Sequence, residues 1–453
     1  MNIVSIASKF MQLAGEERYL KIKYQASRFV NHLPLLRSVI KRHIVNIWLN
    51  DKQMQYSLKL MANGRDDAEH FLNSLTVEEL ADRGKVLFAR LKNYIQNDFK
   101  PGKKTVAIYL VGLGYTENLG TIPYDLFRKG YNVLGLVGST PEQVSELYYE
   151  ARKEVEIDAC ICVGLIEGMP EDTAIIYFVH DIHDSALTNM QKIYRLLPKC
   201  NYILVPNEPA LNRYKEKVLE GRKELFSETD TCEVCFIRGG YPKLDSNIRY
   251  FQKRNEPPST IIYATTVVED IADMVSLPKH SDQIIETILT GVTDRMLIFR
   301  PHPQTMGSQE VAKIARKYHQ HPRFVLDNNP SFYMDNYARS VLMISDLSGT
   351  AFTYALTTLR PVVFFSHNEA EVQKRFGSYQ YFIDRDKVGY VVINVEDLLE
   401  RVRQLIQNAD SYSKRVEEYR NSFIYNVGSS EEYFVDNFEY IIENKKNPDW
   451  TYI

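Results

Sequence analysis

Arg300 and His302 lie where an apolar run ends, in the segment LIFRPHPQ (297–304), with a proline on each side of the histidine. Proline holds φ at about −65° and keeps the residue before it out of a helix, so we expect a stiff loop after a buried strand. Arginine offers charged hydrogen-bond donors and histidine a further one, so this loop could bind an anionic ligand. The alternative is a rigid turn that carries a surface histidine.

A second loop, SDLSGTAF (345–352), follows another apolar run and opens a helical stretch. Asp346, Ser348, Gly349 and Thr350 bring small side chains, hydroxyl groups and exposed N–H groups to the start of that helix. The helix dipole and unpaired N–H groups favour a phosphate at such a position, so we predict an anion site here. An ordinary Ser/Thr helix cap is the alternative.

Two histidines follow a third apolar run, in YFVHDIHDS (177–185). Either His180 or His183 could act as a general base, with Asp181 or Asp184 to orient it, and we prefer His180. The alternative is a cluster of surface polar residues.

A glycine-containing loop, VGLGYTENLG (111–120), follows the first apolar run after residue 103. Its spacing is not G-x-G-x-x-G, so it does not predict a dinucleotide site. Glycines such as Gly114 would instead let the backbone approach a ligand or another loop.

Short apolar runs alternate with helical stretches from residue 103 onward, which indicates an α/β protein with parallel sheets covered on both faces. Parallel strands joined by right-handed crossovers bring the loops that follow them to one edge, so the 297–304 and 345–352 loops should be neighbours. A first series of runs covers residues 105–112, 131–138, 158–164, 173–180 and 201–206, and a second covers 259–266, 296–301, 323–327, 340–346, 360–366 and 389–395.

A polar segment with paired prolines, residues 242–259, separates the two series. We therefore expect two Rossmann-like domains that face a cleft, with ligands outside the carboxyl ends of the strands. The predicted segments are a helical N-terminal region (1–102), an N-terminal Rossmann-like domain (103–245), a C-terminal Rossmann-like domain (246–425) and a C-terminal helical tail (426–453).

The composition is that of a soluble globular protein, and the net charge of −3 argues against a general nucleic-acid-binding protein. No apolar run could span a membrane and no secretion signal is evident, so we expect a cytoplasmic protein. The five cysteines, an odd number, fit a reducing compartment. Cys232 and Cys235 form a lone C-x-x-C pair, and a zinc site needs four ligands, so we predict no metal.

The first 50 residues are basic, because eight lysines and arginines stand against two glutamates, a net charge of +6. Apolar residues recur at helical spacing over 30–49, with Arg37, Lys41 and Arg42 between them. Such a helix could dock on an anionic membrane surface. The alternative is a helix that packs on the next domain and exposes its charges to water.

Four segments, in this order, resemble the CDP-glycerol glycerophosphotransferases, the teichoic-acid-type polymerases and primases with a GT-B fold. The family pattern is a G-x-P-x-x-D turn, a Y-A-P-T-x-R-like strand end, an R-x-H-P loop and a D-x-S-S helix start. The matching segments are FIRGGYPKLD (236–245), TIIYATTVVED (260–270), LIFRPHPQ (297–304) and MISDLSGTAFTYALTTLRPVVFF (343–365).

The resemblance extends over about residues 105–425 and implies roles for single positions. The family's H-G base corresponds to His180, with Asp181 in place of the glycine, and its second serine corresponds to Gly349. Thr265 and Val268 stand where the family has proline and arginine, and Thr265 joins the predicted donor-binding residues.

The resemblance implies transfer of glycerol phosphate from CDP-glycerol to a hydroxyl of a lipid-linked or polymeric cell-surface glycan, without a cofactor. The first Rossmann-like domain would then serve the acceptor and the second the nucleotide donor, at the inner face of the cell membrane. CDP-ribitol or a nucleotide sugar remains open as the donor. The alternatives are a nucleotide-sugar glycosyltransferase or UDP-sugar 2-epimerase of the same fold, and a non-catalytic nucleotide-binding module.

Overall fold

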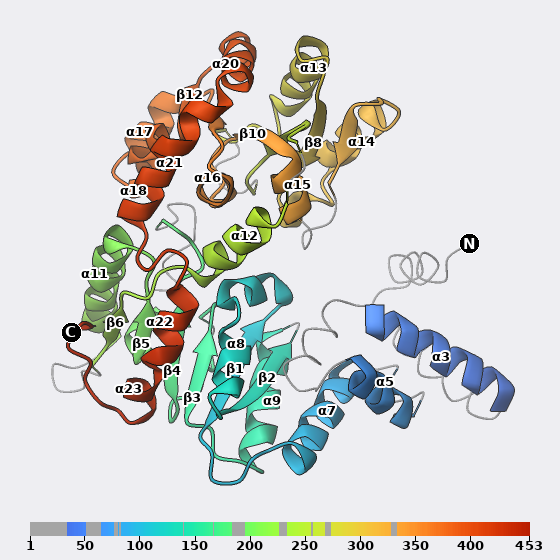
Figure 1. Cartoon of the computed structure of the whole chain (residues 1–453), viewed down its shortest axis with the longest axis vertical. Coiled ribbons are helices and arrows are strands. Elements are labelled where there is room, and N and C mark those ends of the chain that lie inside the picture. The colour runs from blue at the N-terminus through green and yellow to red at the C-terminus, as the bar shows by residue number, and fades with distance from the viewer. Residues whose placement is uncertain are drawn as a thin grey trace. The chain divides into compact units, whose positions relative to one another are not determined.

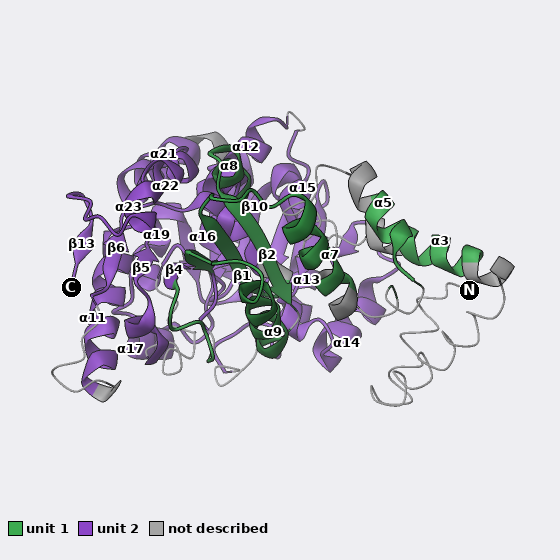
Figure 2. Cartoon of the chain, turned by 90° about the horizontal axis from the view of Figure 1, so that it is seen from below, with its two compact units in different colours: residues 1–113, 123–162, 167–173 green, residues 114–122, 163–166, 174–453 purple. Residues whose placement is uncertain are grey.

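The structure is a computed structural model, and its described residues fall into two compact units, coloured separately in Figure 2. Unit 1 comprises residues 1–113, 123–162 and 167–173, and unit 2 comprises residues 114–122, 163–166 and 174–453. This division does not test the four predicted segments, which stay predictions. The described residues are 34–50, 65–76, 80, 83–138, 140–165, 167–183, 195–225, 233–254, 257–267, 273–327 and 333–453.

The described N-terminal residues form the helices α3 (Pro34–Asn50), α5 (Arg65–Ser74) and α7 (Arg83–Asn97) (Figure 1). Helix α3 packs on α5: Val45 is buried, and Lys41 Nζ donates a hydrogen bond of 2.5 Å to Asn73 O. The first 33 residues, and with them much of the predicted basic segment, lie outside the described residues. In the part of the chain that the structure describes, no helix is long and apolar enough to cross a bilayer.

Unit 1 contains three parallel strands, β1 (Thr105–Val111), β2 (Asn132–Gly138) and β3 (Ala159–Cys162), with β1 between the other two. Almost every residue of these strands is buried, as expected for strands covered on both faces. The 3₁₀ helix η1 (Leu113–Leu119) and helix α8 (Ile122–Arg128) follow β1, and α9 (Pro141–Arg152) follows β2.

Unit 2 contains the strands β4 (Ala174–Phe178), β5 (Tyr202–Leu204) and β6 (Cys235–Ile237), which are parallel to one another. A short strand near the end of the sequence, β13 (Thr451–Tyr452), pairs antiparallel with β6. Neither β6 nor β13 was predicted from the sequence, because both are too short to show a period. The helical elements that accompany these strands are η2 (Leu197–Lys199), α11 (Glu208–Leu225), α22 (Ser430–Asp436) and α23 (Phe438–Ile442).

The second sheet of unit 2 is wholly parallel, with the strand order β12-β11-β10-β7-β8-β9. Its strands are β7 (Thr260–Ala264), β8 (Met296–Arg300), β9 (Phe324–Leu326), β10 (Ser340–Ser345), β11 (Val362–Phe365) and β12 (Gly389–Val392). Its helices are α12 (Pro242–Gln252), α13 (Ser281–Gly291), η3 (Pro303–Thr305), α14 (Gln309–Tyr318), α15 (Tyr333–Arg339), α16 (Thr350–Thr358), α17 (Glu369–Phe376), α18 (Gln380–Ile383), α19 (Arg385–Val388), α20 (Val395–Gln407) and α21 (Ala409–Phe423).

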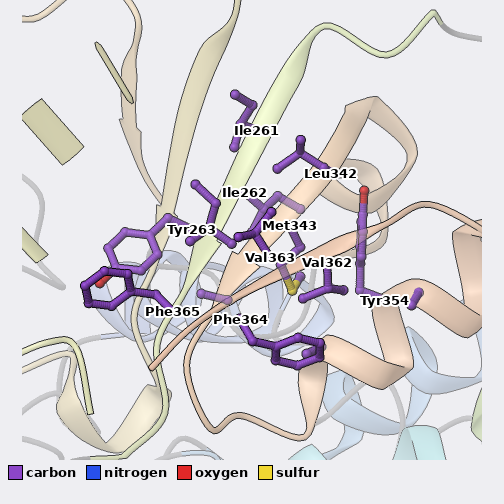
Figure 3. Packing of buried hydrophobic residues seen from close by; sticks show 14 of the residues in the cluster. Ile261, Ile262, Tyr263, Leu342, Met343, Tyr354, Val362, Val363, Phe364 and Phe365 are labelled. Atoms are coloured by element: carbon purple, nitrogen blue, oxygen red, sulfur yellow. The ribbon is translucent and has the colours of Figure 1, made fainter. Parts of the chain in front are cut away.

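Each apolar run that the sequence analysis assigned to a strand contains one, so both predicted strand series are confirmed. The core of the second sheet explains the continuous runs, because residues on both faces of its central strands are buried. Figure 3 shows this packing around β7, β10 and β11, with Tyr354 of α16 against it.

The register of the central strands sets the level at which their loops begin. Ala264, at the end of β7, pairs with Arg300 of β8 and with Ser345 of β10. Three strands therefore end together at one sheet edge, and the loops that follow them start side by side, as predicted.

Substitution of Leu342 in β10, which is fully buried, should test how much this core stabilises unit 2. We expect Leu342→Ala to lower the free energy of unfolding by about 2–5 kcal/mol, because it leaves a cavity in a close-packed core. Urea denaturation followed by circular dichroism measures the change. Ile393→Ala, at a side chain that is 55% exposed just after β12, is the matched control and should stay within about 0.5 kcal/mol of the parent. Equal losses in the two variants would contradict the assignment of the core.

Candidate functional site

His302 occupies the extended conformation that its flanking prolines predict, with φ −58° and ψ 140°. Its Nδ1 accepts a hydrogen bond of 3.3 Å from Gln304 N, and its carbonyl oxygen accepts one of 2.9 Å from Thr305 N. The neutral ring therefore carries its proton on Nε2, which is the atom that can donate to a ligand. The predicted stiff loop after a strand is confirmed, whereas the role of His302 toward a donor stays a prediction.

Arg300 ends β8 with its side chain 14% exposed and held by acidic and aromatic partners. Its Nη1 lies 2.6 Å from Asp327 Oδ2, the oxygen that also accepts a hydrogen bond from Asn336 Nδ2. The guanidinium lies over the ring of Tyr333, at 5.5 Å from its centroid. These contacts fix the arginine before any ligand binds, and Asp327 offsets part of its charge.

Asp346 is fully buried, and its carboxylate accepts four hydrogen bonds from two loops. Its Oδ1 accepts from Thr266 N and Leu347 N, each at 2.8 Å, and its Oδ2 accepts from Ser276 N at 3.0 Å and Ser276 Oγ at 2.8 Å. Burial raises the pKa of this carboxyl group, and the four hydrogen bonds oppose that shift. Asp346 thus ties the loop after β7 to the loop after β10, and its contact with a donor stays a prediction.

The start of α16 carries no side-chain cap, because the residue at its N-cap position is Gly349. The ordinary Ser/Thr cap considered from the sequence is therefore wrong. Neighbouring tyrosines fix this segment instead: Tyr381 Oη donates to Ser348 O at 3.1 Å, and Tyr337 Oη lies 2.6 Å from Thr350 Oγ1. No side-chain cap bonds the first N–H groups of α16, and the positive end of its dipole favours an anion nearby.

The loop after β4 brings the predicted base to this helix start. A Cβ atom built on Gly349 would lie 3.6 Å from Asp181 Oδ1, so the Asp181 carboxylate lies near the N-terminus of α16. The side chain of His180 is 26% exposed, and its Nε2 lies 3.8 Å from Asp181 Oδ2. Its Nδ1 is buried and has no hydrogen-bond partner among the described residues.

His183 has a different environment, because aromatic side chains enclose its ring. The ring stacks with Phe423 at 5.0 Å and lies 4.1 Å from Phe352, and burial lowers the pKa of His183 despite the nearby Asp384. Its Nε2 lies 3.3 Å from Tyr419 Oη and 3.8 Å from Asp384 Oδ2. This geometry favours His180 over His183 as the residue that can reach a substrate.

Two further predicted residues lie at the same edge. Thr265 follows β7, with a backbone hydrogen bond of 3.3 Å from its N to Arg300 O, and its Oγ1 is buried without a partner among the described residues. Gly114 lies in η1, the segment that also contains Tyr115, whose ring meets His180 edge-on at 5.5 Å. The described residues contain no group of three or more His, Cys, Asp or Glu placed to hold a metal ion.

Sequence reasoning missed Asp327, Asn336 and Tyr333, which hold Arg300, because they come from other elements and follow no motif. The G-x-P-x-x-D turn has a structural explanation. Gly240 has a φ of +90°, Pro242 starts α12, and the Asp245 carboxylate accepts from Gly428 N at 2.7 Å and Ser430 N at 2.8 Å.

Replacing Asp346 should show its structural role. In Asp346→Asn an amide N–H₂ would face Ser276 N, and we expect a loss of about 1–3 kcal/mol in the free energy of unfolding, because a buried donor loses its acceptor. The urea midpoint measures this. Asp386→Asn, at a side chain that is 68% exposed, is the control and should leave the midpoint unchanged. A stable Asp346→Asn variant would refute the positioning role.

Comparisons with known proteins bear on the family and the fold. The family model described as CDP-glycerol:poly(glycerophosphate) glycerophosphotransferase matches residues 173–440. A search of curated protein sequences found no match.

Several solved structures are similar in fold. The wall teichoic acid polymerase TagF has a TM-score of 0.53 and 15% identity, over 80% of this chain and 95% of that one. A TagF variant soaked with CDPG has a TM-score of 0.54 and 15% identity, over 79% of this chain and 93% of that one. S. aureus MnaA in a co-structure with UDP has a TM-score of 0.50 and 14% identity, over 77% of this chain and 99% of that one.

At these identities the solved structures show the fold alone, which is the predicted GT-B type. The family model covers more than half of the chain, and it matches the part that contains every strand of the second sheet and the loops after β4, β7, β8 and β10, whereas η1 lies outside it. The chain therefore belongs to the CDP-glycerol:poly(glycerophosphate) glycerophosphotransferase family.

Proposed function

We propose that the chain transfers glycerol phosphate from CDP-glycerol to a hydroxyl of a cell-surface glycan or polymer precursor and releases CMP. Membership of the family and the CDPG soak of the structurally similar TagF support the donor. One observation carries the proposal: the carboxylate of Asp181, the residue after His180, lies near Gly349 at the uncapped start of α16. A candidate base and a candidate phosphate site therefore lie side by side within unit 2.

The acceptor hydroxyl is a weak nucleophile at neutral pH and needs a base as it attacks. Its oxygen forms a bond to the phosphorus that carries glycerol, while the bond from that phosphorus to the oxygen of CMP breaks. The imidazole of His180 takes the hydroxyl proton, and the Asp181 carboxylate stabilises the imidazolium that forms. CMP leaves with the bonding electron pair on its phosphate oxygen.

The leaving phosphate gains negative charge, which fixed donors must stabilise. The start of α16 offers N–H groups and its dipole, and His302 offers Nε2–H from a loop that its hydrogen bonds already hold. Arg300 contributes a positive charge at the same sheet edge, and the buried Thr265 hydroxyl is placed to bond a donor oxygen. Because these groups are ordered beforehand, little entropy is lost when the donor binds.

Release of CMP from CDP-glycerol, with a polymeric acceptor present, tests the proposal. We expect His180→Ala to lower kcat by about 10²–10⁴-fold, because it removes the general base. His302→Ala should also lower kcat, because a charge-stabilising donor is lost. His319→Ala, at an exposed histidine after α14, is the control and should keep the parent activity.

Other outcomes would overturn this function. Isomerisation of a UDP-sugar without any acceptor would establish an epimerase, and transfer of a sugar would establish a glycosyltransferase. Nucleotide binding without product release by the parent protein would indicate a non-catalytic binding module.

We infer further that the enzyme works at the inner face of the membrane, where the basic N-terminal segment binds anionic lipid. An electrostatic dock weakens as salt screens it. The protein should therefore float with vesicles that contain anionic lipid at low salt and should be released at high salt. Vesicles of neutral lipid are the control, and equal flotation with both vesicle types, or none with either, would contradict the dock.

A further inference from the structure

Tyr241 links two segments of the candidate site through one buried hydroxyl group. The residue is 2% exposed and lies directly before α12. Its Oη donates a hydrogen bond of 2.5 Å to His180 O, and it lies 3.2 Å from Asn118 Oδ1, so the two oxygens share its one hydrogen. A single tyrosine thus bonds both the backbone of the predicted base and the loop after β1.

Asn118 also bonds Tyr115, whose ring makes a second contact with His180. Its Nδ2 donates to Tyr115 O at 3.2 Å, and the Tyr115 ring meets the His180 ring edge-on, at 5.5 Å between centroids and 76° between planes. Asn118 is 3% exposed, so water does not compete for these bonds. The four residues form a closed circuit that holds His180 by its backbone and by one edge of its ring.

The turn that carries Tyr241 is itself fixed. Gly240 has a φ of +90°, and a Cβ atom there would lie 2.3 Å from Tyr425 O and 2.4 Å from Ser430 Oγ, so only glycine fits. Tyr241 N donates to Ser430 Oγ at 3.0 Å. The Tyr241 hydroxyl is therefore held in place by the backbone of its own turn and by the segment before α22.

The ring of His180 lacks the usual means of orientation. In many catalytic sites a carboxylate or carbonyl oxygen accepts from Nδ1 of the base and fixes its rotation. Here His180 Nδ1 is buried without a hydrogen-bond partner among the described residues, and Asp181 lies on the Nε2 side at 3.8 Å. The orientation of the base must come from another source.

We propose that Tyr241, acting with Asn118, is a positioning residue that holds His180 in its catalytic orientation. This inference rests on the proposed function, in which His180 is the base. The hydroxyl of Tyr241 fixes the His180 carbonyl, Asn118 fixes the Tyr115 backbone, and the Tyr115 ring limits rotation of the imidazole. Neither Tyr241 nor Asn118 contacts the reacting atoms.

A double-mutant cycle on CMP release separates positioning from simple stabilisation. Tyr241→Phe removes one oxygen atom, and we expect kcat to fall by about 10–100-fold with the KM for CDP-glycerol unchanged, because the base is misplaced and the donor site is intact. In the His180→Ala background the same substitution should have no further effect. Tyr354→Phe is the control: that tyrosine is equally buried and its hydroxyl bonds Ser340 Oγ in the core, so its kcat should match the parent.

Each remaining outcome decides the inference. If Tyr241→Phe keeps the parent kcat, or lowers it equally with and without His180, the tyrosine does not act through His180 and the inference is wrong. If His180→Ala keeps full activity, the proposed function itself fails. If Tyr241→Phe does not fold, Asn118→Ala can be used instead, because it interrupts the same set of contacts. The inference then requires that Asn118→Ala lowers kcat by the same factor and has no further effect in the His180→Ala background.

Discussion

The buried carboxylate of Asp346 is the constraint on which the candidate site depends. Two parallel strands bring their ends to one level, but level ends alone do not fix the loops beyond them. Three hydrogen bonds to Asp346, from Thr266 N, Ser276 N and Ser276 Oγ, join the loop after β7 to the loop after β10, and a fourth from Leu347 N lies within the second loop. Removing a carboxylate from water is costly, and the four donors offset part of that cost, so an arrangement of the two loops that supplies all four is favoured.

Contacts at three residues hold the turn over residues 180–183 in place. Tyr241 bonds the carbonyl oxygen of His180, Asn207 Nδ2 donates to Ile182 O at 2.6 Å, and His183 lies among Phe352, Phe423 and Tyr419. Two histidines three residues apart thus have opposite roles. One is enclosed and anchors the turn, and the other stays partly exposed beside the start of α16. Their environments, rather than their residue type, separate them.

Sequence patterns predicted the strands, their parallel pairing and the stiff 300–303 loop, because these follow from local apolar runs and from proline geometry. They could not predict that Asp346 is buried and bonded to the loop after β7, since a buried carboxylate and an exposed one look alike in sequence. The partners of Arg300 and the Tyr241–Asn118 link were also missed. Arg300 and Asp327 are 27 positions apart and Tyr241 and Asn118 are 123 apart, and only the folded chain brings them together. Short strands such as β6 carry too few residues for a periodic signal.

The pairing of β13 with β6 has a consequence for how the protein is made. Val234 and Ile453 exchange two backbone hydrogen bonds of 3.0 Å each, although more than 200 residues separate them. During synthesis, β6 therefore stays an unpaired sheet edge until the ribosome has made the second sheet and then β13. Exposed edges recruit strands from other molecules. A fragment that stops after residue 245 would carry this open edge permanently, so the two sheets are a poor choice for separate expression even though each has its own strands.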